Sequence, residues 1–279
     1  MQERLRPWWA ERGRDLPWRR ARDPWAVLVS EAMLQQTQVA RVLRRYEAFL
    51  ELFPTPAACA AAPVAEVVRA WSGLGYNRRA VSLHRTAVAV VEQHGGRLPA
   101  DRQALEALPG VGAYTARAVL AFAFEMDVGV VEVNTARVLA RVAGRTLSAA
   151  EAQDAADALV PAGEGWVWNQ AMVDLGATVC TRRAPACAEC PIAGLCRWTA
   201  DRATAPDPAA RPPRQAAFAG SDRQGRGRLV DALRRGPVGP HGLAAAAGWP
   251  DDADRARRVA ATLVADGLAV YHAGGLRLP

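Results

Sequence analysis

Between residues 26 and 200, apolar residues recur mostly at intervals of three and four, which predicts a succession of amphipathic helices. Pro54, Pro56 and Pro63 interrupt the pattern, and Gly95–Gly96 is typical of a helix C-terminus. The short segment VGVVEV could pass for a strand, but it lies among predicted helices. The pattern therefore predicts a mainly α fold. The clearest helical segments are 25–53, 64–74, 78–94 and 101–108.

The pattern changes near the C-terminus. Residues 200–216 are rich in Pro, Ala and charge, which is typical of a linker between a domain at 1–199 and another at 217–279. The second domain is predicted to contain three helices, around 226–235, 241–247 and 254–266, followed by a hairpin in 268–279. This order favours a small winged-helix-like α+β domain. A generic small α+β unit is the alternative.

Composition narrows the choice of partner. The formal net charge is +7 with a sequence pI of about 9.8, which favours an anionic partner, most often nucleic acid. On charge alone, a basic surface with no specific partner is an equal alternative. All 35 basic residues are arginine, so no lysine can form a Schiff base. No apolar run reaches membrane-spanning length and the first residues are charged, so we expect a cytoplasmic protein with no membrane contact.

The segment LPGVGAYTA predicts two helices joined by a tight turn at Gly110 and Gly112. Glycine permits positive φ, and backbone amides at the start of the second helix form a favourable site for an anion. We expect Gly110 and Gly112 to hold one DNA phosphate without reading a base. An ordinary helix–turn–helix joint is the alternative for these glycines alone.

Four of the five cysteines form the pattern C-x6-C-x2-C-x5-C, whereas Cys59 stands alone and is expected in the core. Thiolates bind iron–sulfur clusters and zinc, but structural zinc sites more often have two C-x2-C pairs. The spacing resembles that of the [4Fe-4S] loop in endonuclease III-like and adenine glycosylases, and this resemblance favours a [4Fe-4S] cluster over zinc. The expected ligands are Cys180, Cys187, Cys190 and Cys196.

Together, the LPGVG turn, the cysteine spacing and the segment VSEAMLQQTQV resemble A/G-specific adenine DNA glycosylases (MutY type) of the helix-hairpin-helix iron–sulfur superfamily. The resemblance covers about residues 5–200. It implies a two-lobed, mainly helical glycosylase domain with a [4Fe-4S] loop, preceding the small C-terminal domain. It also implies base removal through a carboxylic acid and a second, ionised carboxylate, acting on a base extruded from the duplex.

Carried over from the family, Glu31 is the general acid that protonates adenine at N7. Apolar neighbours on its helix are expected to raise its pKa. The second carboxylate of the family is an Asp, followed by Asn134 and by Arg137-Val138 in this sequence, which fix the register. Glu132 occupies the Asp position, and the register argues against Asp127. The extra methylene moves the carboxylate by roughly 1 Å, enough to change a rate about a hundredfold.

The remaining resemblances define the substrate site. Tyr114 stands where bifunctional relatives carry a Schiff-base lysine, which implies a monofunctional enzyme without a lysine-dependent lyase step. The segments LPWR, QQTQ, WSGLGY and WNQAMVDLG resemble stretches that contact the extruded base or probe the opposite one. The residues implied are Trp18, Arg19, Gln36, Thr37, Leu74, Tyr76 and Gln170, with Leu74 and Tyr76 expected to intercalate.

The sequence thus predicts a monomeric, cytoplasmic, nucleoid-associated base excision repair enzyme. Its expected partner is double-stranded DNA in which adenine is mispaired with 8-oxoguanine or guanine. Two alternatives stay open. One is a thymine or uracil mismatch glycosylase, which Tyr114 also fits. The other is a catalytically weak iron–sulfur protein that binds lesions, which the unusual Glu132 allows. The residues after 217 are too few for the larger C-terminal domain that many adenine glycosylases carry.

Overall fold

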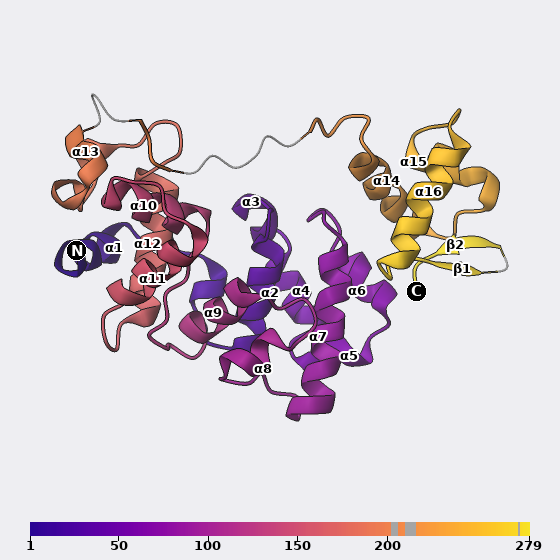
Figure 1. The fold of residues 1–279 in the computed structure, drawn as a ribbon. Helices are drawn as coiled ribbons and strands as arrows, with labels where there is room; N and C mark the ends of the chain where they lie inside the picture. The colour runs from indigo at the N-terminus through magenta and orange to yellow at the C-terminus, as the bar shows by residue number, and fades with distance from the viewer. Residues whose placement is uncertain (202–205, 210–215, 273) are drawn as a thin grey trace. The chain divides into compact units, whose positions relative to one another are not determined.

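The computed structural model describes residues 1–201, 206–209, 216–272 and 274–279. Most of the predicted linker, 200–216, therefore lies outside the described residues. The chain is mainly helical, with one small two-stranded sheet near its C-terminus, as the sequence predicted (Figure 1). Among the described residues, no helix combines the length and the apolar character needed to cross a membrane.

The chain forms two compact units, and each draws on separate parts of the sequence. Unit 1 comprises Met1–Val27, Ala100–Gln103 and Gly112–Pro213. Unit 2 comprises Leu28–Pro99, Ala104–Val111 and Arg214–Pro279. The predicted glycosylase domain therefore contributes to both units. Helices α2 (Pro24–Leu34) and α8 (Arg102–Glu106) each run from one unit into the other.

Unit 1 is built around helix α12, which packs against α1, α9 and α10. Its core gathers apolar side chains distant in sequence, among them Leu5, Leu139, Trp168 and Ile192. Its elements are α1 (Gln2–Arg12), η1 (Pro17–Arg19), α9 (Ala113–Phe122), α10 (Val133–Ala143), α11 (Ala149–Leu159), α12 (Gly165–Asp174), the π-helical turn η2 (Leu175–Val179), η3 (Cys187–Glu189), η4 (Ala193–Leu195) and α13 (Arg197–Asp201).

Unit 2 is centred on the longest helix, α7, which packs against α5 and α6. The fully buried Trp71 meets Phe49 edge-on, with ring centroids 5.8 Å apart. Gly95 ends α7 in the left-handed conformation, as the sequence predicted. The helices before the C-terminal region are α3 (Val39–Leu43), α4 (Tyr46–Leu52), α5 (Pro56–Ala61), α6 (Val64–Ala70) and α7 (Arg78–His94).

The apolar pattern over 25–53 forms three helices, α2, α3 and α4. The first break falls after Leu34, where Gln36 adopts a φ of 54°. A left-handed non-glycine residue is uncommon and stops a helix at once. Gln36 therefore lies on an exposed loop, here called the Gln36 loop, and Tyr76, with a φ of 45°, lies on a second loop that precedes α7.

The predicted hairpin is confirmed between α8 and α9. Gly110 has a φ of 79°, and a Cβ there would approach the Ser82 Cβ to 2.7 Å, so glycine is required. Thr86 on α7 donates a hydrogen bond to the Pro109 carbonyl at 2.5 Å and anchors the turn. Gly112 begins α9 as its N-cap, and nothing lies within 4 Å of a Cβ built there. The amides that start α9 are thus open to an anion.

Residues 216–279, here called the C-terminal module, have the element order of a winged helix. The helices are followed by a hairpin in which Tyr271 pairs with Leu276, and Val238 bridges to Leu276 as a third short strand. The elements are α14 (Asp222–Arg235), η5 (Pro240–Gly242), α15 (Leu243–Ala247), α16 (Ala253–Ala265), β1 (Val270–His272) and β2 (Gly275–Arg277).

Candidate active site

Glu132, the carboxylate predicted to stabilise the sugar cation, is the N-cap of α10. Its Oε2 accepts a hydrogen bond from the Asn134 amide at 2.8 Å, and its Oε1 accepts one from the Thr135 amide at 2.9 Å. Burial raises the pKa of Glu132, and the two amide bonds offset only part of that rise. The longer Glu side chain therefore folds back onto the helix terminus, where the helix dipole favours a negative charge.

One turn of α10 links Glu132 to the cysteine loop. Arg137 donates from Nη2 to the Asn134 Oδ1 at 2.7 Å and to the Gly176 carbonyl at 2.5 Å. Its Nε donates to the carbonyl of Cys180 at 2.8 Å. A Cβ on Gly176 would lie 2.6 Å from the Asn134 Cβ, so this approach needs glycine. Asn134 is thereby fixed by contacts on both sides.

Asp127, the nearby acid that the register argued against, has another role. It accepts hydrogen bonds from the amides of Gly163 at 2.7 Å and Gly165 at 3.0 Å, which shapes the loop before α12. Asn169, which the sequence reasoning missed, holds the segment before Glu132: its side chain bonds the Val130 amide and the Val128 carbonyl, both at 2.8 Å. These contacts hold residues 128–130, which belong to no helix or strand, against α12.

Arg19 and Trp18 lie in η1, and both are buried. Arg19 donates to the two oxygens of Asp174 at 2.7 and 2.8 Å, and Asp174 also accepts from Arg14 and from the Trp9 indole. Burial opposes ionisation of Asp174, but the hydrogen bond and charge of Arg19 hold its pKa below the usual value. Asp174 thus joins α1, η1 and α12. The sequence feature that could have identified Asp174 as a buried residue is its position within the apolar run AMVDLGATV.

Two further predicted residues lie in unit 1. Tyr114 is half-buried in the first turn of α9, directly after the hairpin. Gln170 is buried on α12, beside Asn169. Their assignments to the base pocket stay predictions.

Glu31, the predicted general acid, lies in unit 2 on α2, with only 6% of its surface exposed. An exposed carboxylate on a helix is the common case, so its burial is informative. Helix α2 ends three residues later, at Leu34, and leads directly into the Gln36 loop. Glu31 is therefore a buried acid next to a loop predicted to contact DNA.

Arg79, which the sequence reasoning also missed, joins the Gln36 loop to the loop that carries Tyr76. Its Nη1 donates to the carbonyls of Ala32, Met33 and Gln35 at 2.7, 2.9 and 2.6 Å, satisfying the end of α2. Its Nη2 donates to the Thr37 hydroxyl at 2.8 Å and to the Gly75 carbonyl at 3.1 Å. Burial lowers the pKa of Arg79 to about 10, well above neutrality.

The predicted opposite-base residues differ in exposure. Tyr76 adopts a φ of 45° and is 45% exposed, whereas Leu74 is 2% exposed. The Leu74 carbonyl accepts from the Thr37 hydroxyl at 3.2 Å, which joins the two loops a second time. Gln36 is on the first loop and is exposed. In this structure Tyr76 and Gln36 are the accessible side chains, and intercalation by Leu74 stays a prediction.

The four predicted cluster ligands lie on one irregular loop after η2. All four cysteines are free thiols and half-buried. Burial raises the pKa of Cys190 to about 11, and the charges of Cys180, Cys196 and Cys187 act in the same direction. Ile192, 1% exposed, anchors the loop in the core of unit 1.

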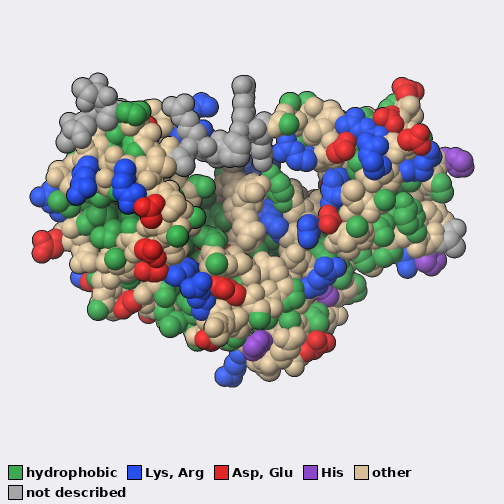
Figure 2. All heavy atoms as spheres, in the orientation of Figure 1, with side chains coloured by type: hydrophobic (Ala, Val, Ile, Leu, Met, Phe, Trp, Pro, Cys, Tyr) green, Lys and Arg blue, Asp and Glu red, His purple; other side chains and the backbone are tan. Residues whose placement is uncertain are grey.

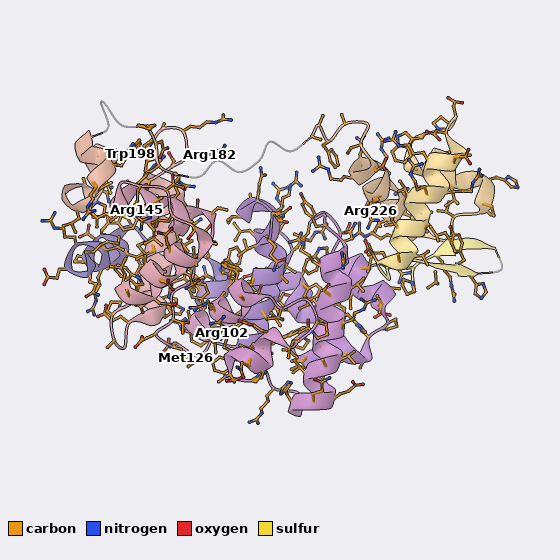
Figure 3. The ribbon with its side chains drawn as sticks, in the orientation of Figure 1. Arg102, Met126, Arg145, Arg182, Trp198 and Arg226 are labelled. Carbon is orange, nitrogen blue, oxygen red and sulfur yellow. The ribbon has the colours of Figure 1, made fainter. Side chains whose placement is uncertain are left out.

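Arg141 closes this loop from α10. It donates from Nη1 to the Cys180 Sγ at 3.2 Å, and the Cys196 thiol donates to its backbone carbonyl at 3.3 Å. Its guanidinium also pairs with Asp207 at 2.7 Å and stacks over Trp198, labelled in Figure 3, at 4.6 Å from the ring centroid. A buried cation bonded to a ligand sulfur fits a thiolate-bound group.

Four unbridged thiols with a cationic neighbour fit a [4Fe-4S] cluster, in which each thiolate binds a separate iron. Among the described residues, no three His, Cys, Asp or Glu side chains form a site for a single metal ion. The residues that would hold the cluster are the four cysteines of the loop, Cys180, Cys187, Cys190 and Cys196.

Comparison with known proteins agrees with this geometry. The family model of "HhH-GPD superfamily base excision DNA repair protein" matches residues 29–161, and that of "Iron-sulfur binding domain of endonuclease III" matches residues 180–196. An adenine DNA glycosylase from Mycobacterium tuberculosis is 44% identical over a match covering 97% of this chain and 90% of its own.

Two solved structures share the fold. A thermostable thymine-DNA glycosylase matches with a TM-score of 0.68 and 31% identity, covering 71% of this chain and 94% of its own. An endonuclease III trapped on DNA matches with a TM-score of 0.62 and 24% identity, covering 72% of this chain and 94% of its own.

Proposed function

Because this chain belongs to the family of adenine DNA glycosylases, we propose that it removes adenine from double-stranded DNA where adenine is mispaired with 8-oxoguanine or guanine. The chain is a base excision repair glycosylase with a [4Fe-4S] cluster, and it hydrolyses the N-glycosidic bond. The observation that carries the adenine preference is the near-full-length match to an adenine-specific relative, which covers 97% of this chain.

In the proposed reaction two carboxyl groups act on the target nucleotide. Glu31 donates a proton to N7 of the extruded adenine, which makes the base a better leaving group. The bond between N9 and C1′ then breaks, and the electron pair leaves with the base. The carboxylate of Glu132 stabilises the resulting cation at C1′, and a water adds there and loses a proton.

The other site residues bind and orient. Tyr114 and Gln170 contact the extruded nucleotide and Asn134 fixes Glu132, while Trp18 and Arg19 form the wall of the base pocket. Gln36, Thr37, Leu74 and Tyr76 contact the opposite strand, and the turn at Gly110 and Gly112 binds a phosphate. The cluster, when bound, acts structurally, holding the loop 180–196 in shape against DNA.

The product is expected to be an intact abasic site. A lyase step that uses an amine needs a lysine or the N-terminal amine, and this chain contains no lysine. Tyr114 occupies the position at which bifunctional relatives carry a Schiff-base lysine. We further propose that the enzyme acts as a monomer in the cytoplasm, on the nucleoid.

A second candidate function is removal of thymine or uracil from mismatches. The solved thymine-DNA glycosylase, 31% identical to this chain, favours it. The two functions differ in the proton acceptor, because thymine has no N7. The adenine proposal therefore depends on Glu31 in a way that the thymine alternative does not.

The test is single-turnover base release from four duplexes that differ in one pair: A opposite 8-oxoguanine, A opposite G, T opposite G, and A opposite T. We expect release from the first two only, with strand breakage appearing only after alkali. Faster release from T opposite G would overturn the adenine assignment. Binding without any release, restored by Glu132→Asp, would support a lesion-binding protein instead.

A further inference from the structure

A short stretch of the predicted linker lies against the cysteine loop. Residues 206–209 follow the four cysteines, and they are fastened to unit 1 at two points. The Asp207 carboxylate accepts hydrogen bonds from Nη2 and Nε of Arg141 at 2.7 and 3.1 Å. The Thr146 hydroxyl, in the loop after α10, donates to the Pro208 carbonyl at 3.1 Å. This stretch is therefore held beside the arginine that contacts the cysteine loop.

The carboxylate of Asp207 fixes the direction of the Arg141 guanidinium. The Ala209 amide donates to the Asp207 Oδ1 at 3.0 Å, so the carboxylate is itself oriented by the backbone. A guanidinium is a rigid planar fork, so two nitrogens bound to Asp207 determine where the third one points. The third nitrogen, Nη1, donates to the Cys180 Sγ at 3.2 Å and to the Thr181 carbonyl at 2.9 Å. Asp207 thus acts on an expected cluster ligand through one arginine.

The pair formed by Arg141 and Asp207 is largely shielded from water. The Arg141 side chain is 2% exposed, and that of Asp207 is 26% exposed. A buried cation that loses its partner is strongly unfavourable, so Arg141 depends on the Asp207 carboxylate. Because buried charges are screened little by salt, both charges act on the Cys180 sulfur more strongly than surface charges do.

The surroundings of this pair are cationic. Figure 2 shows arginines exposed over the part of unit 1 that carries α10 and α13, and Figure 3 labels two of them. The exposed arginines on the cysteine loop, directly after it and after α10 are Arg182, Arg183, Arg197 and Arg145. Asp207 brings a negative charge into this region, in contact with the cation that bonds a ligand sulfur. Net charge and hydrogen bonds to the sulfurs set the reduction potential of an iron–sulfur cluster.

We propose that Asp207 is part of the iron–sulfur site of this chain, although it lies outside the segment 180–196 that supplies the cysteines. It is a positioning residue, because it acts through Arg141 and does not bind iron. It holds Arg141 against the Cys180 sulfur and offsets the positive charge of Arg141, which keeps the reduction potential of the cluster low. A cluster that is difficult to reduce keeps one charge state, which suits its structural role.

The test measures the midpoint potential of the cluster in the full-length holoprotein by film voltammetry, in which the electrode supplies the electron. Asp207→Asn removes the charge and keeps an oxygen that accepts from Arg141, whereas Asp207→Glu keeps the charge. Glu189→Gln is the matched control, because Glu189 is an exposed carboxylate of the cysteine loop that pairs with Arg12 at 3.7 Å. Iron content and thermal unfolding verify each variant.

We expect Asp207→Asn to raise the ratio of reduced to oxidised cluster at a fixed potential about tenfold, which corresponds to about 59 mV. The reason is that loss of a negative charge favours the more negative, reduced cluster. Asp207→Glu should stay within about twofold of the parent protein, because the local charge is unchanged. Glu189→Gln should also change the ratio by less than about twofold, because an exposed charge is screened by salt.

Resonance Raman spectra report on the hydrogen bond to the sulfur. Asp207→Ala removes every acceptor that orients Arg141, so it should shift the Fe–S stretching bands of the cysteine ligands. Asp207→Asn should leave these bands near their parental positions, because an acceptor for Arg141 is kept. Bands that do not respond to Asp207→Ala would show that Asp207 does not position Arg141.

An unchanged potential in Asp207→Asn, or an equal shift in Glu189→Gln, would overturn the proposal. Faster proteolysis within the predicted linker at an unchanged potential would show that residues 206–209 only tether the chain. If Asp207→Asn cannot be isolated with its cluster, Asp207→Glu decides: a parental potential supports the role of the charge, and a tenfold shift of the ratio refutes it. Adenine release is measured separately, so its failure would leave this result standing.

Discussion

Replacement of Glu132 separates its structural role from its chemical one. The carboxylate caps α10 through two amide bonds of 2.8 and 2.9 Å. Removing a capping side chain costs about 0.5–2 kcal/mol, so Glu132→Ala should lower the melting temperature by a few degrees. Glu132→Gln keeps one acceptor and removes a buried charge, so its stability should stay within about 1 kcal/mol of the parent protein.

The catalytic effects should follow a different order. Glu132→Gln should reduce single-turnover base release by about a hundredfold or more, because a neutral amide does not stabilise a developing cation. Glu132→Asp should fold normally, since Asp is a good N-cap, but should lose about tenfold or more because its carboxylate is withdrawn by roughly 1 Å. Faster release by Glu132→Asp than by the parent protein would refute the view that this site is built around glutamate.

The raised pKa of Glu132 gives the same residue a pH signature. Base release should fall on acidification at a higher pH than for an ordinary glutamate, because the carboxylate becomes protonated earlier. Because the pKa of Glu132 is raised in the folded state, its protonated form stabilises the fold at pH values below the unfolded pKa of about 4.5. This stabilisation is lost as the pH rises through the folded pKa. The melting temperature of Glu132→Gln minus that of the parent protein should therefore increase as the pH rises from the unfolded pKa to the folded pKa. A difference that does not vary with pH would contradict this reasoning.

Three further outcomes test the rest of the site. Glu31→Gln should abolish adenine release while the Kd for an abasic-analogue duplex changes little; near-parental rates would show that Glu31 is not the acid. Cys190→Ser should lower the visible absorbance of the cluster and weaken DNA binding more than the chemical step, whereas the control Cys59→Ser should leave that absorbance unchanged. Asp174→Asn should destabilise unit 1 by about 3–5 kcal/mol, because it leaves the buried Arg19 without its counter-charge, whereas the exposed control Asp15→Asn should leave the melting temperature nearly unchanged. Equal melting temperatures for Asp174→Asn and Asp15→Asn would refute the structural role of Asp174.

Local chemistry made much of the fold predictable. Gly110 sets the hairpin because its positive φ and its close contact with Ser82 leave no room for a side chain, and Gly95 ended α7 because glycine readily adopts the left-handed conformation. Cysteine spacing identified the loop because ligand residues must lie close along the chain. The C-terminal hairpin followed from the Gly-Gly pair between two short apolar segments, and the pairing of Tyr271 with Leu276 confirms it.

The residues that the sequence did not reveal act over long distances along the chain. Asp174 meets Arg19 across 155 positions, and Asn169 supports Val130 across 39. Nothing local distinguishes such residues from ordinary polar positions, because their partners are defined only once the helices have packed. Arg79 was hidden for another reason: one arginine among 35 basic residues carries no pattern that marks it as buried.

The clamp formed by Arg79 also bears on how unit 2 meets its ligand. A single guanidinium holds the ends of both exposed loops through carbonyl groups on each, so the loops are preorganised and need little ordering on binding. A lysine would not reproduce this, since its compact ammonium lacks the planar fork of donors. Arg79 thus favours DNA binding in this region by ordering the two loops beforehand, and it can do so without contacting the DNA itself.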